Sequence, residues 1–236
     1  MSIVLLKQSL RIKLFRIIKI ELTLPVKNSS KGIIQRIIEW DHKTFLKLYR
    51  EKRFQGRKIK VIAKIVSFIA AGEFWGLIWL IWTIYGYITK DYYLLVLFTG
   101  GFIQSIILHI IIRYKIVQRK RPYITLEDKG VKQHDELIRE DKSFPSGHVA
   151  FLLLFGIIFA FFFQNWIILL IFILLDVIVA ITRLILGVHF PTDVLCGFLF
   201  GALYALLYLA LTYLYWVDLF YWLGGIFSPI IHFWKN

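Results

Sequence analysis

Residues 149–186 have the sequence VAFLLLFGIIFAFFFQNWIILLIFILLDVIVAITRLIL, in which one polar pair, Gln164 and Asn165, separates two long apolar stretches. A helix needs about 20 apolar residues to cross the hydrocarbon core of a bilayer. The second stretch reaches that length, and the first comes close to it if its helix extends back to Ser146. We therefore predict two membrane-spanning helices that are joined at the polar pair.

Three further stretches, residues 61–89, 92–112 and 194–216, meet the same criterion and bring the expected number of spans to five. Residues 219–234 are also apolar, but two glycines and a proline interrupt them. We expect an interfacial or partial helix there, with a sixth span or a re-entrant segment as the alternatives. The expected fold class is an all-α, polytopic membrane helix bundle with five to six spans.

The composition is typical of a membrane protein. Hydrophobic residues make up 58% of the 236 residues and the mean hydropathy is +0.68, whereas a soluble domain has roughly 45–50% apolar residues. Lys and Arg outnumber Asp and Glu by 29 to 15, which gives a net charge of +14. Such a surplus suits nucleic acid or anionic lipid. Because only the net charge favours nucleic acid, we expect the lipid bilayer as the partner.

The first 60 residues carry 16 of the 29 basic residues and only four acidic ones. Five cations alternate with apolar residues at spacings of two to four, namely Lys7, Arg11, Lys13, Arg16 and Lys19. This pattern predicts an amphipathic helix on a membrane surface rather than a signal peptide, whose apolar core carries no charges. Residues 33–49 repeat the pattern. We therefore divide the chain into a basic amphipathic arm, residues 1–60, and a membrane domain, residues 61–236.

Residues 113–144 form a polar insertion with nine basic and six acidic residues. With five spans, this insertion, the N-terminal arm and the turn at residues 183–193 lie on one side of the membrane. The positive-inside rule makes that side cytoplasmic, but a single miscounted span inverts the assignment, so the membrane face stays open. The Ile-, Lys- and Phe-rich composition favours a bacterial inner membrane.

Three short polar clusters lie at the ends of the predicted spans, on that same side. The first is RYKIVQRKRP at residues 113–122, the second is PSGH at residues 145–148, and the third is Arg183, His189 and Asp193. Arginine offers a planar fork that matches phosphate oxygens, and the free N–H groups at a helix N-terminus receive anions. The clusters therefore predict a phosphate-binding site.

The imidazoles supply chemistry for that site. His189 and Asp193 are four residues apart, so the carboxylate can hold one ring nitrogen of the histidine. The other ring nitrogen can then attack phosphorus as a nucleophile. A second imidazole, that of His148, can protonate the leaving alkoxide.

Together the clusters resemble the signature of the type 2 phosphatidic acid phosphatase superfamily, which includes membrane lipid phosphate phosphatases and is related to bacterial acid phosphatases and vanadium haloperoxidases. The resemblance covers about residues 61–216. It implies an all-helical core and a phosphohistidine intermediate that water hydrolyses, without a metal or other cofactor. By position it implies His189 as nucleophile, Asp193 as its orienting carboxylate, His148 as general acid, and Arg121, Ser146, Gly147 and Arg183 as phosphate binders.

The first cluster departs from this signature at one position. The family has a lysine seven residues before the arginine that corresponds to Arg121, and this chain has Tyr114 there. Lys115 and Arg113 flank that position, and we expect Lys115 to supply the missing phosphate contact. Because neighbouring side chains on a helix point about 100° apart, this substitution requires a local adjustment.

The expected function is that of an integral membrane enzyme that hydrolyses a phosphomonoester or diphosphate of a membrane lipid. The resemblance implies phosphatidic acid, phosphatidylglycerophosphate, undecaprenyl diphosphate or lipid A phosphates as substrates, and the sequence does not choose among them. One alternative is a lipid phosphotransferase that uses the same residues. Another is a non-catalytic lipid-binding or transport protein, which the tyrosine at position 114 favours. The oligomeric state stays open.

Two more polar residues lie inside the predicted spans. We expect His109 to be an interior histidine with a hydrogen-bond partner rather than a ligand. Asp176 lies seven residues before Arg183, on the same helix face and two turns away. Ionisable groups inside membranes are often functional, so we expect Asp176 to support the site through an ion pair or a hydrogen bond.

Overall fold

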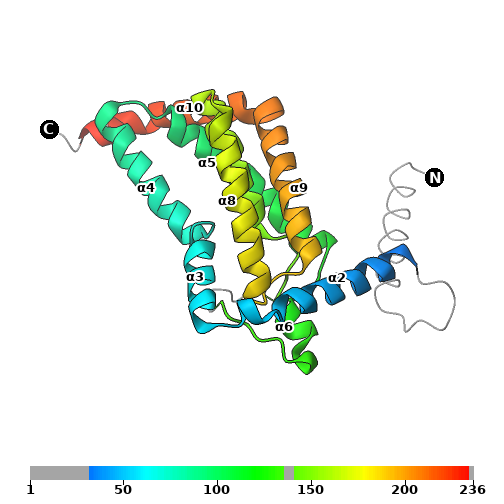
Figure 1. Ribbon diagram of the computed structural model, residues 1–236. Helices are drawn as coiled ribbons and strands as arrows, with labels where there is room; N and C mark the ends of the chain where they lie inside the picture. The colour runs from blue at the N-terminus through cyan, green and yellow to red at the C-terminus, as the bar shows by residue number, and fades with distance from the viewer. Residues whose placement is uncertain (1–31, 136–140, 234–236) are drawn as a thin grey trace, which may run out of the picture. The chain divides into compact units, whose positions relative to one another are not determined.

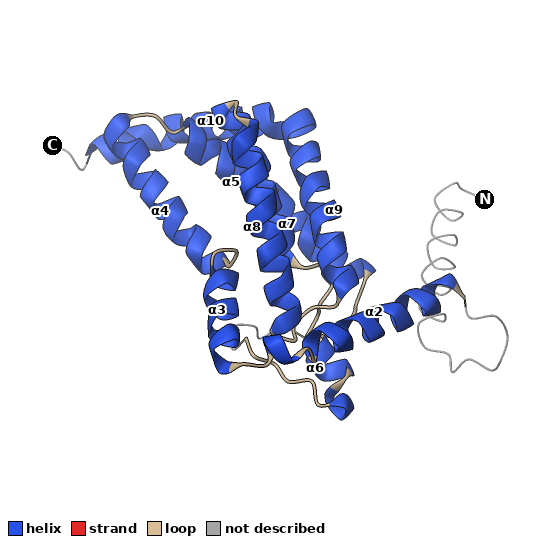
Figure 2. Ribbon diagram, viewed as in Figure 1, coloured by secondary structure: helices blue, strands red, loops and turns tan. Residues whose placement is uncertain are grey.

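A computed structural model describes residues 32–135 and 141–233, with side chains described as far as Gly225. Within these residues the chain is helical and has no strand (Figure 2), which confirms the all-α class. The amphipathic helix expected around residues 7–19 lies outside the described residues. The chain separates into two compact units, Met1–Trp40 and Asp41–Asn236, and the description below concerns the second. The functional division after residue 60 stays a prediction.

Helix α2 (Ile33–Tyr49) covers the range of the second amphipathic pattern and continues into this unit. Its buried residues are Asp41, Phe45 and Tyr49. They are four residues apart and therefore lie on one face of the helix. An acidic side chain thus shares the buried face of α2 with two aromatic rings.

Four helical segments of the described chain are long and apolar enough to cross a membrane, namely Arg57–Thr89, Tyr93–Ile116, Trp166–Ile185 and Pro191–Gly225. The helix α7 (Gly147–Phe163) is apolar but shorter. Its 17 residues rise about 26 Å, slightly less than the roughly 30 Å of a hydrocarbon core. The expectation of five spans thus depends on whether α7 crosses the membrane, and it stays a prediction.

The helices follow one another as shown in Figure 1. The first long segment consists of α3 (Arg57–Phe68) and α4 (Gly72–Thr89), and the second of α5 (Tyr93–Ile111) and the π-helical turn η2 (Ile112–Ile116). The third is α8 (Trp166–Ile185), and the fourth comprises α9 (Pro191–Leu207), the π-helical turn η4 (Tyr208–Thr212) and α10 (Tyr213–Phe233). The short helices are η1 (Lys52–Phe54), α6 (Pro122–Thr125) and η3 (Glu127–Lys129).

Two of the observed helix boundaries differ from those that the sequence predicts. The first expected span, residues 61–89, is divided between α3 and α4. Residues 219–233 belong to α10, which in Figure 1 runs across the end of the bundle that lies opposite α6. Helix α10 thus joins residues 219–233 to the end of the last expected span, residues 194–216, and the interfacial position that we expected for them stays a prediction.

Helix α7 occupies the centre of the bundle and packs against α5, α8 and α9. Close approach depends on two glycines. A Cβ atom on Gly156 would lie 2.4 Å from the Cβ of Phe172, and one on Gly201 would lie 2.5 Å from the carbonyl oxygen of Ala150. Because these contacts leave no space for a side chain, α7 lies directly against α8 and α9, and its first residues are held beside those of α9.

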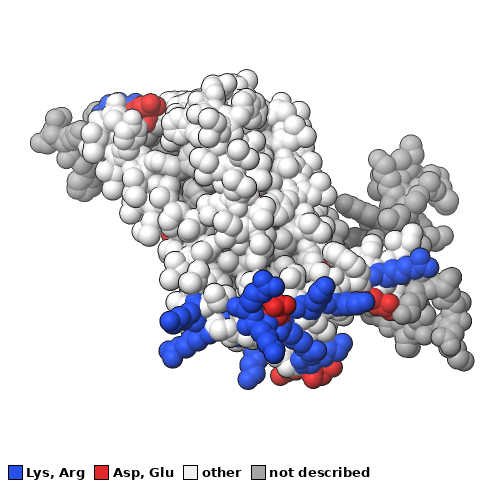
Figure 3. All heavy atoms as spheres, viewed as in Figure 1, with Lys and Arg blue, Asp and Glu red and all other residues white. Residues whose placement is uncertain are grey.

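Lys and Arg side chains gather at the end of the molecule where α6 lies (Figure 3). The three polar clusters of the sequence adjoin helix ends that lie at this end of the bundle (Figure 1). Helices α5 and α8 end here, and α7 and α9 begin here. The expectation that these clusters share one side thus agrees with the structure.

Candidate active site

Ser146 is the N-cap residue of α7, but its hydroxyl does not cap the helix. The Ser146 backbone N–H donates to the carbonyl of Asp193 at 2.9 Å, which joins the beginnings of α7 and α9. The Oγ atom is buried and has no hydrogen-bond partner among the described residues. A buried hydroxyl without a partner is costly, so this serine is suited to a ligand that lies at the helix N-terminus.

Arg183 lies in the last turn of α8 and is fully buried. Its Nη1 donates to Asp135 Oδ2 at 2.7 Å and to Ser67 Oγ. The remaining donors, Nε and Nη2, are buried and meet no hydrogen-bond acceptor in the described part of the chain. Because a guanidinium with unused N–H groups is expensive to bury, these donors indicate an anion site.

The loop that carries Asp135 is fastened to the same end of the bundle. The N–H of His134 donates to the Leu186 carbonyl at 3.0 Å, and the N–H of Lys132 donates to the Tyr49 hydroxyl at 3.0 Å. Gly187 has φ +76°, a conformation that favours glycine, and a Cβ there would lie 2.6 Å from the Lys132 carbonyl oxygen. The turn after α8 therefore accepts this loop only because residue 187 is glycine.

His189 follows that turn and is buried. The Arg121 guanidinium lies 3.3 Å from Nε2 of His189 and also donates to the Val188 carbonyl at 3.0 Å. Arginine can only donate, so Nε2 is the accepting nitrogen and Nδ1 carries the hydrogen. The Nδ1 atom lies 3.7 Å from Asp193 Oδ2, which is an electrostatic contact rather than a hydrogen bond.

Burial lowers the pKa of His189 well below its ordinary value of 6.5, and three neighbouring guanidinium groups lower it further, those of Arg121, Arg183 and Arg113. The backbone carbonyl of Ser143 has the opposite and smaller effect. Desolvation and positive neighbours both disfavour an imidazolium ion. At neutral pH His189 therefore offers an unprotonated Nε2.

Asp193 stands in the first turn of α9 and is fully buried. Its Oδ2 accepts from the Phe190 N–H at 2.8 Å, and its Oδ1 accepts from Arg119 Nη1 at 3.0 Å. Arg119 also donates to Thr192 and to Asp41, a residue of α2, and its guanidinium lies 4.0 Å from the ring centre of Phe190. The catalytic carboxylate of the sequence prediction is thus held by a cation that the sequence reasoning did not select.

Asp41 completes this network from outside the three clusters. It accepts from the Thr192 N–H at 2.9 Å, from the Thr192 hydroxyl at 2.7 Å, and from Arg119. The sequence carried one signal for it, since Asp41 shares its helix face with two aromatic residues that are buried as well. An acid on an apolar face needs a buried partner, and Arg119 is that partner.

The structure brings Arg113 rather than Lys115 to the site. Arg113 donates to the Pro145 carbonyl at 2.8 Å, beside the PSGH cluster. Lys115 is exposed in η2, and Tyr114 is partly exposed. Two steps of about 100° separate the side chains of residues 113 and 115 on a helix, so they cannot face the same ligand. Arg113 is therefore the better placed of the two candidates for the phosphate contact that we expected of Lys115.

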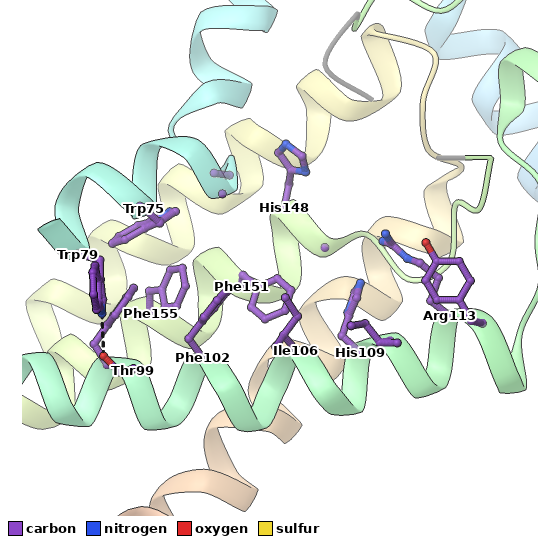
Figure 4. Close-up of a pocket in the computed structure, with 17 residues that line it drawn as sticks. Trp75, Trp79, Thr99, Phe102, Ile106, His109, Arg113, His148, Phe151 and Phe155 are labelled. Atoms are coloured by element: carbon purple, nitrogen blue, oxygen red, sulfur yellow. Dashed lines mark hydrogen bonds between the residues drawn. The ribbon is translucent and has the colours of Figure 1, made fainter. Parts of the chain in front are cut away.

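A cavity of about 550 Å³ leads away from this cluster between α4, α5 and α7. Figure 4 shows Arg113, His109 and His148 near one part of it, and Trp75, Trp79, Phe102 and Phe155 farther along. His148 lies near enough to Arg121, Arg183 and His189 to interact with them electrostatically. The cavity therefore joins the polar cluster to an aromatic, apolar groove.

Of the two polar residues inside the spans, Asp176 differs from expectation and His109 agrees with it. Both carboxylate oxygens of Asp176 are buried and have no hydrogen-bond partner among the described residues, so the expected ion pair or hydrogen bond to the site is absent. Two helical turns, about 10 Å, separate it from Arg183. His109 has a partner, since its Nδ1 lies 3.3 Å from the Tyr204 hydroxyl, but its ring also lines the cavity.

Comparisons with known proteins concern the family and the fold. A family model described as the PAP2 superfamily matches residues 90–216. The fold is similar to the crystal structure of the first transmembrane PAP2 type phosphatidylglycerolphosphate phosphatase from Bacillus subtilis, with a TM-score of 0.60 and 22% identity over 73% of this chain and 84% of that chain. It is also similar to Aquifex aeolicus LpxE, with a TM-score of 0.57 and 21% identity over 72% of this chain and 95% of that chain. The comparison with curated proteins found no match.

Proposed function

This chain belongs to the PAP2 superfamily, and on that premise we propose that it is an integral membrane phosphatase that hydrolyses a phosphomonoester or diphosphate of a membrane lipid. One observation carries the proposal. Three buried donors, Nε and Nη2 of Arg183 and Oγ of Ser146, meet no acceptor among the described residues. A bound phosphate group supplies acceptors for all three.

Phosphate binding follows from charge and hydrogen bonding. Arg121 and Arg183 neutralise the phosphate, and their N–H groups form charge-assisted hydrogen bonds to its oxygens. The Ser146 hydroxyl and the N–H groups at the start of α7 contribute further donors, and the positive end of the helix dipole favours the anion. Gly147 leaves this N-terminus open to close approach.

The reaction proceeds in two steps at the same phosphorus. Nε2 of His189 attacks, a nitrogen–phosphorus bond forms, and the bond from phosphorus to the lipid oxygen breaks as His148 gives a proton to that oxygen. Asp193 stabilises the positive charge that develops on the His189 ring. Water then attacks the phosphohistidine, His148 takes a proton from it, and release of phosphate restores His189.

The apolar groove supports a lipid as the substrate. It adjoins His148 and is lined by Trp75, Phe102, Phe151 and Phe155, and its volume of about 550 Å³ lies within the roughly 300–1,000 Å³ of ligand pockets. Long helices with apolar surfaces surround it. A phosphate at the polar end places a hydrocarbon chain in the groove, and the phosphatidylglycerolphosphate phosphatase from Bacillus subtilis offers an example of such a substrate.

Phosphate release from a panel of lipid phosphates in detergent, with EDTA present, tests the proposal. The panel contains phosphatidic acid, phosphatidylglycerophosphate, a prenyl diphosphate and a lipid A phosphate. We expect release by the wild type and none by His189→Ala, with Lys115→Ala, at an exposed cation, as the matched control. Release that needs a metal ion contradicts the metal-independent mechanism, and no release from any lipid contradicts the function.

A further inference from the structure

His109 stands where the polar cluster meets the groove. It lies in the last turn of α5, and only 4% of the residue is exposed. Its ring lines the cavity together with Arg113, Gly147 and His148 (Figure 4). The Nε2 atom is buried and finds no hydrogen-bond partner in the part of the chain that the structure describes.

The hydrogen bond to Tyr204 fixes which nitrogen of His109 carries the hydrogen. The Tyr204 hydroxyl lies 3.3 Å from Nδ1 and is buried with the residue. If Nδ1 were the donor, the hydroxyl hydrogen would be left without an acceptor among the described residues, which is costly in an apolar interior. The hydroxyl therefore donates to Nδ1. An uncharged imidazole then carries its hydrogen on Nε2.

The donor at Nε2 lies beside Gly147, and both residues line the cavity. A Cβ atom on Gly147 would lie 3.3 Å from Nε2 of His109 and 3.5 Å from an Nη atom of Arg113. A side chain at residue 147 would therefore crowd Nε2, whereas glycine leaves this part of the cavity wall open to a ligand. That part lies beside the start of α7, where phosphate binds, and the groove lining continues from it with Ile106 and Phe151.

We propose that Nε2 of His109 donates a hydrogen bond to an oxygen of the leaving group next to the scissile phosphate. His109 thereby selects lipids that carry such an oxygen, in a glycerol ester or a second phosphate, over plain alkyl phosphates. This inference rests on the proposed function. It assigns to His109 a role in substrate selection that is separate from the chemistry of His148 and His189.

The test compares three substrates in detergent with the wild type and His109→Leu. They are a diacylglycerol phosphate, a prenyl diphosphate and hexadecyl phosphate, whose leaving group has no oxygen beyond the scissile ester. One neutral hydrogen bond corresponds to a loss of about fivefold to tenfold. We expect kcat/KM to fall by that factor for one or both oxygen-bearing substrates, while hexadecyl phosphate changes by less than about twofold. The substrate that loses activity identifies the source of the oxygen.

Equal losses for all three substrates, or no loss for any, overturn the inference. Tyr204→Phe removes the hydroxyl that orients His109 and is expected to produce a smaller loss with the same selectivity, so it decides the matter if His109→Leu does not fold. Tyr208→Phe is the matched control, because its hydroxyl donates to the Leu97 carbonyl at 2.7 Å away from the cavity. A wild type that hydrolyses none of the substrates instead contradicts the proposed function.

Discussion

Arg119 and Asp193 form an ion pair, with 3.0 Å between Nη1 and Oδ1. Arg119 thus binds Oδ1 of Asp193, whereas Oδ2, the oxygen nearer to His189, accepts a hydrogen bond from the Phe190 N–H. Asp193 is therefore fixed on two sides before a substrate binds. Because Asp193 lies 3.7 Å from Nδ1 of His189, we expect Arg119 to influence the position of His189 through Asp193.

Replacing Arg119 with Met tests this dependence. A hydrogen bond to a charged group contributes about 1.5–3 kcal/mol, so we expect kcat to fall by about tenfold or more while KM changes little. Arg119→Lys should recover part of kcat because it restores the charge. The control is Arg53→Met, which removes an exposed pair with Glu51 at 3.4 Å. A change confined to KM would contradict the positioning role.

Arg183→Lys tests the phosphate site without a lipid. Lysine keeps the charge but has no planar fork. Its ammonium group therefore does not replace both the Nη1 bond to Asp135 and the Nε and Nη2 donors that we assign to phosphate. We expect inorganic phosphate to inhibit the variant at least about tenfold less strongly, as judged from the loss of one or two charge-assisted bonds. Inhibition constants measured in detergent check this result. An unchanged constant would remove Arg183 from the phosphate binders.

The pKa of His189 predicts how stability depends on pH. Burial holds the pKa below its ordinary value of 6.5 in the folded protein, so the unfolded chain binds the proton more readily. This contribution is fully present above pH 6.5 and is lost as the pH falls through the lower folded pKa. We expect the wild type to lose more thermal stability between pH 7.5 and pH 5 than His189→Gln does. Equal losses in thermal unfolding experiments would refute the assignment.

A comparison of Gly187 with Gly130 can distinguish the cost of an unfavourable backbone conformation from the cost of a steric clash. Gly187 and Gly130 both have φ +76°, but only Gly187 has a close neighbour, the Lys132 carbonyl. Alanine at either position costs about 1–2 kcal/mol for the left-handed conformation. We expect Gly187→Ala to lower the unfolding temperature further than Gly130→Ala and to reduce activity, because it displaces the loop that carries Asp135. Identical unfolding temperatures would argue against this role of the turn.

Filling the groove should distinguish lipids by chain length. Gly76 lines the cavity on α4, and a Cβ there meets nothing within 4 Å, so we expect Gly76→Leu to narrow the groove without a clash at Cβ. We expect kcat/KM to fall for a long-chain phosphatidic acid and to stay unchanged for a dihexanoyl analogue. Gly224→Leu, on α10 and equally uncrowded, is the control. A loss for both substrates would show a folding defect rather than a groove.

The fold class and the meeting of the clusters could be predicted from the sequence because each depends on local patterns. Apolar runs of sufficient length determine helices, and Ser146, His189 and Asp193 each lie next to a helix end. The choice between Arg113 and Lys115 could not be made in the same way. It depends on which side chain of the turn η2 faces Pro145. Arg113 and Pro145 are 32 residues apart in the sequence, so no local pattern indicates their contact.

The network behind Asp193 was missed for a related reason. Arg119 is one of several cations in the first cluster, and no local pattern distinguishes it from Lys120. Asp41 pairs with it across 78 residues, so only the packing of α2 in the folded unit brings the two together. Asp176 shows the opposite error, since its spacing from Arg183 suggested a contact that the helix geometry does not provide.

The position of Asp41 shows that the hydrogen-bond network around Asp193 extends beyond the part of the chain that matches the family. The family match begins at residue 90, and all of the signature residues lie within it. A shortened protein that starts after α2 would keep the entire signature, yet Arg119 would lose one of its two anionic partners and Thr192 would lose the acceptor of its N–H and hydroxyl groups. We therefore expect a form of this protein that lacks Asp41 to lose activity even though every residue of the signature is present.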